Sequence, residues 1–163
     1  MRTPLFAALA LLTLSAVAHP QTPAKPAPKM TQKSPTADQV QQSAIVIDTH
    51  ADTPQRFVDE HFDLADPLGT GNLNLDSIHK GNLGAEFFSI WVDPVANQGR
   101  FAGRTFDLID AVKQQVAKHH DQMVFVTSPE GIEQAHREHK FAALMGIEGG
   151  HSIEDSLPLL RQY

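Results

Sequence analysis

Short apolar runs alternate with longer amphipathic stretches from Ala44 to the end of the chain. Three of these runs, residues 44–47, 85–92 and 141–147, have the composition of buried strands, and a shorter run covers residues 123–126. Strands that alternate with helices are typical of a parallel sheet, because each parallel strand needs a crossover connection before the next one. The sequence therefore predicts an α/β fold.

The stretches that follow the second, third and fourth apolar runs have features of helices. Apolar residues recur every three or four positions from residue 102 to residue 119. A second helix is predicted from the Thr-Ser-Pro-Glu sequence at 127–130 to about His139, because a Thr or Ser cap followed by proline and glutamate suits a first turn. Residues 152–162 have the pattern of one further helix, which has no capping residue before Tyr163.

The number of residues limits the size of the sheet. A closed (β/α)8 barrel needs roughly 250 residues, and the body of this chain, residues 38–163, supplies about half of that. The fold is therefore either a smaller open α/β sheet or the N-terminal portion of a TIM-like barrel. The uncapped last helix favours a barrel that is truncated at Tyr163.

The N-terminal residues have the features of a secretory signal peptide, residues 1–18. Arg2 is followed by an apolar run from Leu5 to Leu14 and by an Ala-Val-Ala cleavage site. This run is shorter than the roughly 20 residues that a membrane span needs. Residues 19–37 hold five prolines and three lysines and are predicted to form a disordered tether. We expect a periplasmic or secreted protein without a transmembrane anchor.

Charge and composition narrow the chemistry of the body. It carries all 19 acidic residues of the chain but only nine of the 13 basic ones, and such a surface is unsuited to nucleic acid. The chain has no cysteine, which excludes disulfides, thiol nucleophiles and cysteine zinc sites. A Gly-x-Ser-x-Gly elbow and a His-Glu-x-x-His helix are also missing. Any metal ligands must therefore be His, Asp or Glu side chains.

The first apolar run leads directly into His50 and Asp52. Residues two apart on a strand point to the same side, so an imidazole and a carboxylate would project together from the carboxyl end of this strand. In a parallel barrel these ends form the active-site mouth, and such a pair suits a divalent cation such as zinc. The alternative is that Asp52 caps the segment that follows and that His50 is a hydrogen-bonded core residue.

Glu148 follows the last apolar run in the same way and precedes Gly149 and Gly150. A carboxylate at this position would lie at the same edge of the sheet as His50 and Asp52, where its two oxygens could bridge two cations. The glycines would let a backbone or a ligand approach closely. The alternative is that Glu148 pairs with an arginine and that the glycines only form a turn.

Five other histidines lie in a different context. His61 and Asp63 have the spacing of the first motif, but they follow acidic residues rather than an apolar strand. The histidines at 119–120 and at 136 and 139 lie in charged helical stretches. We interpret all of these as surface residues, so only the three strand-end residues above are predicted to bind metal.

The segments that carry these three residues, residues 47–52 and 146–152, resemble the two N-terminal metal motifs of the membrane dipeptidase family. Their order and separation agree with the family, as does the stretch at 157–163. The resemblance covers about residues 44–163, and the second motif is the more specific of the two. It implies the fold of a metal-dependent hydrolase barrel.

The resemblance also implies a role for each residue: His50 and Asp52 bind one zinc ion, and Glu148 bridges two. Members of the family hydrolyse dipeptides, with a metal-bridging hydroxide as the nucleophile. Two further histidine ligands, a substrate-contacting histidine and an acidic residue for proton transfer lie later in the family's pattern, at positions that this chain does not have. We therefore expect a zinc metallopeptidase whose isolated chain is inactive.

Two other functions stay open at this point. A related barrel metal hydrolase could act on another amide, an ester or a lactam. A metal-free binding module or remnant is the other alternative, although an isolated half-barrel would leave sheet edges uncovered and would be unstable or self-associate. A dipeptide is the expected ligand, and a homodimer is compatible with the family resemblance.

Overall fold

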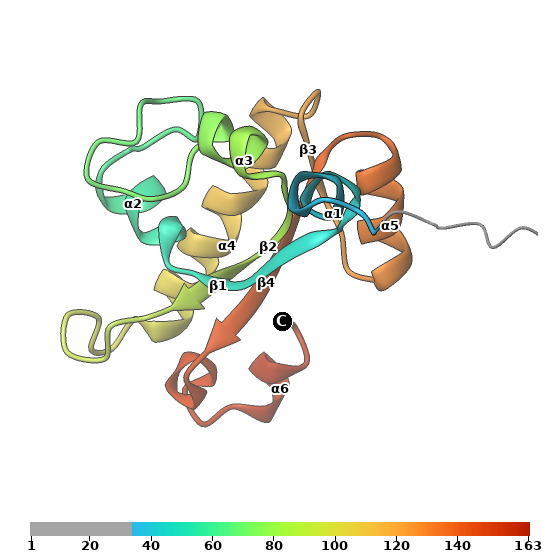
Figure 1. Ribbon diagram of the computed structural model, residues 1–163. Coiled ribbons are helices and arrows are strands. Elements are labelled where there is room, and N and C mark those ends of the chain that lie inside the picture. Colours follow the sequence, from blue (N-terminus) through green and yellow to red (C-terminus); the bar gives the residue numbers. More distant parts are fainter. Residues whose placement is uncertain (1–33) are drawn as a thin grey trace, which may run out of the picture. The chain divides into compact units, whose positions relative to one another are not determined.

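The structure is a computed structural model that describes residues 34–163, and in that range four strands alternate with helices (Figure 1). Most of the predicted elements are present within one or two residues of their expected bounds. The elements are α1 (Ala37–Ser43), β1 (Val46–Ala51), α2 (Thr53–Asp59), α3 (Leu75–Gly81), β2 (Leu83–Trp91), α4 (Phe101–Lys118), β3 (Met123–Phe125), α5 (Pro129–Arg137), β4 (Phe141–Glu148), the 3-10 helix η1 (Gly150–Ile153) and α6 (Leu157–Leu160).

The four strands form one parallel sheet in the order β1-β2-β4-β3. The predicted α/β class is therefore confirmed. β4 pairs with β2 along seven consecutive residues, from Ala85 opposite Ala142 to Trp91 opposite Glu148. β3 pairs only with the first three residues of β4 and lies at the edge of the sheet. The central strands β2 and β4 thus hold the two longer apolar runs of the sequence.

Side-chain caps explain where several helices begin. The Asn74 side chain accepts a hydrogen bond from the Ser77 amide, and the Ser77 hydroxyl accepts one from the Asn74 amide, so α3 starts with a reciprocal capping box. Ser128 caps α5 by accepting from the Gly131 amide, as its sequence predicts. α2 and α3 lie between β1 and β2, and the sequence pattern predicts neither of them. Each has only seven residues, which is too short for a clear helical period.

The predicted helix at 152–162 is wrong. η1 ends at Ile153, and Glu154 and Asp155 have positive φ angles of 48° and 55°, which break the helical path. The chain resumes a single helical turn at Leu157 under a cap from Ser156. The pattern of apolar residues in this segment therefore reflects two short elements rather than one helix.

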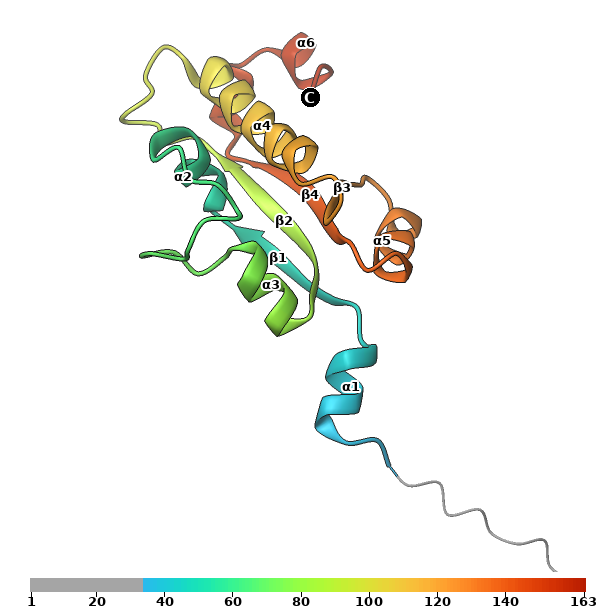
Figure 2. The same cartoon turned by 90° about the horizontal axis from the view of Figure 1, so that it is seen from above.

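Two apolar clusters cover the two faces of the sheet, because alternate residues of a strand point to opposite sides. On one face, Phe88 and Ile90 pack with residues of α2, α3 and α4. On the other face, Ala85 and Leu144 pack with Ala135 of α5. Figures 1 and 2 both show α5 beside β3 and β4, on the far side from α2 and α3. The second face is covered only in part, because the buried residues that β2 and β4 give to its cluster all lie in the first halves of these strands.

The segments around His61 and His119 are both expected from the sequence to lie on the surface, and the structure corrects this in part. Phe62 is 6% exposed and packs in the first cluster, and His119 is 9% exposed. The His119 ring hydrogen-bonds to the Asp63 carboxylate at 2.7 Å, and Lys118 forms an ion pair with the same carboxylate. Asp63 and His119 are 56 residues apart in sequence, and they fasten the loop after α2 to the end of α4. His61 is exposed, as expected.

The predicted signal peptide, residues 1–18, lies outside the described residues, as does most of the predicted tether at 19–37. Helix α1 begins at the last residue of that tether, Ala37, with a capping box formed by Thr36 and Gln39. None of the helices within residues 34–163 combines the length and the apolar content that crossing a bilayer requires.

Candidate metal centre

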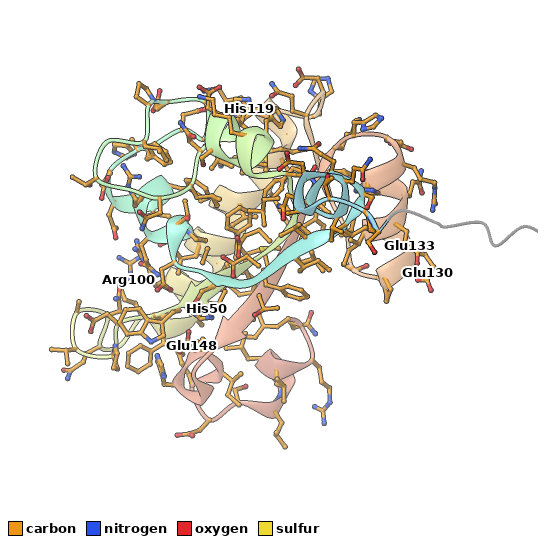
Figure 3. All side chains as sticks on the ribbon, viewed as in Figure 1. His50, Arg100, His119, Glu130, Glu133 and Glu148 are labelled. Carbon is orange, nitrogen blue, oxygen red and sulfur yellow. The ribbon has the colours of Figure 1, made fainter. Side chains whose placement is uncertain are left out.

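His50, Asp52 and Glu148 lie together at the carboxyl end of the sheet, although Glu148 follows His50 by 98 positions in the sequence. One potential ligand atom from each residue lies within 4.8 Å of the other two. His50 Nε2 lies 3.6 Å from Asp52 Oδ1 and 3.5 Å from Glu148 Oε2. Figure 3 shows the His50 and Glu148 side chains next to each other at the ends of β1 and β4. Of the residues at 34–163, only these three form such a group.

A bulge in β1 sets the direction of His50. Asp48 pairs with Glu86 and Ala51 pairs with Phe88, so three residues of β1 span two residues of β2. The His50 amide donates to Asp48 Oδ1 at 3.1 Å, which stabilises this local turn. The His50 side chain is 55% exposed, so it is not the hydrogen-bonded core residue of the alternative interpretation.

Asp52 occupies the N-cap position of α2, but its side chain makes no capping hydrogen bond. Its carboxylate lies instead beside the His50 ring. The start of α2 is held by other contacts, since Gln55 donates to the Trp91 carbonyl at 2.6 Å and Arg104 donates to Gln55 and to Asp59. The Asp52 side chain is thus not needed to cap α2, and it is 64% exposed.

Glu148 is the last residue of β4, and no arginine contacts it among the described residues. Its Oε2 atom accepts a hydrogen bond from Ser89 Oγ at 3.1 Å. Gly149 then turns the chain with a φ of 93°, where an added Cβ atom would overlap the His151 ring. The His151 ring in turn hydrogen-bonds to the Val92 carbonyl at 2.7 Å. The glycine therefore lets the chain turn sharply directly after Glu148.

The donor set fits a divalent metal ion. Ligand atoms about 2.0–2.2 Å from a tetrahedral zinc ion lie roughly 3.4 Å from one another, close to the 3.5 and 3.6 Å separations between His50 Nε2 and the two carboxylates. Both separations exceed the usual 2.7–3.2 Å of a hydrogen bond to nitrogen, so these groups are not satisfied by each other. One imidazole nitrogen and two carboxylate oxygens are ligands that zinc accepts.

A hollow of about 540 Å³ adjoins the group on the side of α2. Its walls include His50, Asp52, Arg56 and Asn72, and Glu86 contributes to its lining from β2. Glu86 is fully buried, and neither of its carboxylate oxygens has a hydrogen-bond partner within the described part of the protein. Burial, together with the nearby charge of Asp48, raises the pKa of Glu86 to about 8. Glu86 is therefore mainly protonated at neutral pH.

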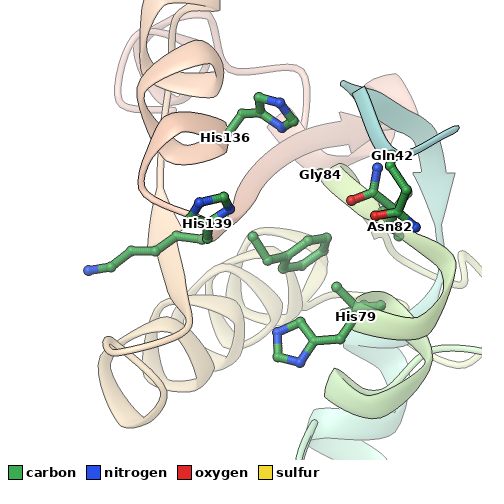
Figure 4. Close-up of a pocket in the computed structure, with 10 residues that line it drawn as sticks. Gln42, His79, Asn82, Gly84, His136 and His139 are labelled. Carbon is green, nitrogen blue, oxygen red and sulfur yellow. The ribbon is translucent and has the colours of Figure 1, made fainter. Parts of the chain in front are cut away.

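A second hollow, of about 280 Å³, lies near the opposite end of the strands. Figure 4 shows His79, His136 and His139 around it, from α3, from α5 and from the residues that follow α5. Within residues 34–163 these histidines do not bring three ligand atoms together as the first group does. Within the described part of the chain, the candidate metal centre is therefore the group at the carboxyl end of the sheet.

Ser89 and Glu86 contribute to this region, although neither belongs to a recognisable sequence motif. Both lie inside the apolar run of β2, where most neighbours are Phe, Ile or Ala. A polar side chain within such a run is the signal that could have identified them, because a buried polar group normally needs a partner. The sequence alone does not show which partner each one has.

Comparison with known proteins gives one family. The family model of the membrane dipeptidases, peptidase family M19, matches residues 35–163. Dipeptidase 3 of Mus musculus is 35% identical over 94 residues, which are 57% of this chain and 18% of that protein. Dipeptidase 3 of Homo sapiens is 28% identical over 141 residues, which are 83% of this chain and 28% of that protein. The chain thus spans less than a third of either relative.

Solved structures agree on the fold. The probable dipeptidase PvdM from Pseudomonas aeruginosa superposes with a TM-score of 0.67 at 20% identity, over 77% of this chain and 33% of that one. Dipeptidase AC, a metallopeptidase of family M19, superposes with a TM-score of 0.62 at 18% identity, over 72% of this chain and 40% of that one. The parallel sheet and its helices are therefore part of the TIM-like barrel fold that these proteins have.

Proposed function

Because the chain belongs to the membrane dipeptidase family, peptidase family M19, we propose that it supplies the first three ligands of a zinc centre that hydrolyses dipeptides. The observation that carries this proposal is the convergence of His50, Asp52 and Glu148 within 4.8 Å at the carboxyl end of a parallel sheet. That end of the strands is where barrel enzymes place their active sites.

In this proposal each residue has a separate task. His50 and Asp52 would hold one zinc ion, and Glu148 would be shared between that ion and a second one. Such a pair of ions, when bound, lowers the pKa of water so that a nucleophile exists at neutral pH, and polarises the scissile carbonyl.

The Glu148 carboxylate suits a bridging role for two reasons. Its side chain is 52% exposed, so one face is open to solvent and substrate. Its Oε2 atom accepts a hydrogen bond from Ser89 and lies beside His50, and no arginine or lysine forms an ion pair with the carboxylate within residues 34–163. A carboxylate that keeps its negative charge attracts cations most strongly.

The test is hydrolysis of dipeptides by the intact gene product, measured as release of free amino acids. We expect a chelator to abolish the activity and added Zn²⁺ to restore it. Glu148→Gln should lower kcat/KM by more than 100-fold, because changes to residues that merely support a metal ligand already cost about 10–100-fold. Glu133→Gln is the matched control, since Glu133 lies on α5 with a side chain that is 62% exposed.

Activity that survives both the chelator and Glu148→Gln would remove the basis of the proposal. Hydrolysis of a lactam or an ester but not of dipeptides would keep the metal centre and change the substrate class. A folded protein that binds no Zn²⁺ would instead support a binding module.

We further propose that residues 1–18 direct export and that residues 19–37 form a tether. The composition of both segments supports this. A mature N-terminus near His19 in the extracellular or periplasmic fraction is the expected result.

A further inference from the structure

The hydroxyl group of Ser89 makes a direct contact with the candidate metal centre from a buried position. Ser89 is 2% exposed and lies in β2 between Phe88 and Ile90, which are both fully buried. Its Oγ atom donates to Glu148 Oε2 at 3.1 Å, and this is the oxygen that lies 3.5 Å from His50 Nε2. A single buried donor thus fixes the oxygen that faces the other predicted ligands.

Strand order explains why a small residue is needed at this position. β2 lies between β1 and β4, and strands two apart in a sheet are separated by about 9.5 Å. The His50 and Glu148 side chains nevertheless approach to 3.5 Å, so they meet above β2. A large side chain at position 89 would fill that space, whereas serine leaves room and provides a hydroxyl.

The register of β4 allows the same contact. Ser89 pairs with Gly146, and Trp91 pairs with Glu148, so Ser89 and Glu148 are offset by two residues on one face of the sheet. The two side chains therefore project from the same face, and the Glu148 carboxylate lies within hydrogen-bonding distance of the Ser89 hydroxyl.

From this geometry we infer that Ser89 is a positioning residue, which holds the Glu148 carboxylate in the orientation that binds metal. A neutral hydroxyl suits this task, because it restricts the rotation of the carboxylate without cancelling its charge, as a lysine or arginine partner would. Groups that hydrogen-bond to a ligating carboxylate orient it and tune the affinity of the centre. The inference rests on the proposed function, in which Glu148 binds zinc.

The experiment measures the affinity of the intact chain for Zn²⁺ by competition with a chromophoric chelator. We expect Ser89→Ala to weaken binding by about 10–100-fold, the usual effect of removing a group that supports a ligand. Ser89→Thr keeps the hydroxyl and suits a strand, so it should bind Zn²⁺ within about threefold of the wild type. This rescue separates the hydrogen bond from a general effect on packing.

Ser128→Ala is a matched control, because it also removes a serine hydroxyl, but from the cap of α5. It should lower the midpoint of thermal unfolding and leave the affinity for Zn²⁺ unchanged. Equal losses of affinity in Ser89→Ala and Ser128→Ala, or in Ser89→Ala and Ser89→Thr, would overturn the positioning role.

Glu148→Gln distinguishes failure of this inference from failure of the proposed function. If the wild type and Glu148→Gln bind Zn²⁺ equally, Glu148 is not a ligand and the proposed function itself fails. If Glu148→Gln weakens binding but Ser89→Ala does not, the zinc centre stands and only the role of Ser89 is refuted.

Discussion

Replacing Glu86 by glutamine should make this protein more stable at alkaline pH. Glu86 is fully buried in β2, and the structure raises its pKa from 4.5 to about 8, through burial first and the charge of Asp48 second. Between these two pH values the unfolded chain has released the proton, whereas the folded chain still holds it. The contribution of Glu86 to stability is therefore fully present below about pH 4.5 and is lost as the pH rises toward 8.

The size of this effect follows from the shift in pKa. Each pH unit in the window costs about 1.4 kcal/mol, so the free energy of unfolding should fall by about 4 kcal/mol between pH 5 and pH 8. This is a large share of the roughly 5–15 kcal/mol that stabilises a typical domain. Glutamine has almost the same shape and cannot ionise. Glu86→Gln should therefore match the wild type near pH 5 and exceed its stability by about 4 kcal/mol at pH 8.

Urea unfolding at several pH values, followed by the fluorescence of the single tryptophan, Trp91, measures the difference. A chelator in all samples removes any contribution from bound metal. Glu133→Gln on the exposed face of α5 is the control and should stay within about 0.5 kcal/mol of the wild type at every pH. A constant difference between Glu86→Gln and the wild type from pH 5 to pH 8 would refute the reasoning, as would a loss of stability in the variant at pH 8.

Two further predictions concern the backbone turn after Glu148 and the clamp on the loop after α2. Gly149→Ala should lower the free energy of unfolding by about 1–3 kcal/mol, because Gly149 has a φ of 93° and a Cβ atom there would overlap His151. The control is Gly150→Ala, whose Cβ atom meets nothing within 4 Å. Equal losses in urea unfolding of both variants would contradict this account. Asp63→Asn should cost about 2 kcal/mol at pH 7. Burial alone would raise the pKa of Asp63, but hydrogen bonds from Lys118, the Ala65 amide and His119 lower it from 3.8 to about 2. This stabilisation is present above about pH 3.8 and disappears as the pH falls through 2, so the variant and the wild type should converge in acid.

The predicted metal ligands could be located from sequence because their positions depend on local features. β4 ends at Glu148, and β1 ends one residue before Asp52. An apolar run followed at once by a polar side chain indicates the end of a buried strand. Parallel strands place their carboxyl ends at the same edge of a sheet, so two such ends bring their side chains together without knowledge of the rest of the fold.

Other parts of the structure depend on contacts between distant segments and could not be predicted in this way. The burial of His119 depends on Asp63, which lies 56 residues earlier and carries no motif that identifies it as a partner. In the same way, the break in the predicted helix at 152–162 depends on Glu154, whose carboxylate accepts a hydrogen bond from the Ala102 amide at the start of α4. A pattern of apolar residues within one segment contains no information about either contact.

The bulge in β1 is a local feature that the two-residue period of a strand does not predict. A strict two-residue period would place Asp48 on the same side as His50 and would add a fourth ligand to the group. Instead, Asp48 pairs with Glu86 and Ala51 pairs with Phe88, so the bulge breaks the two-residue period between Asp48 and His50. The Asp48 carboxylate accepts a hydrogen bond from the His50 amide and is not part of the three-residue group. Because of the one extra residue in β1, Asp48 and Asp52 have different neighbours and different effects. Asp52 stays beside His50, while the charge of Asp48 helps to keep the buried Glu86 protonated.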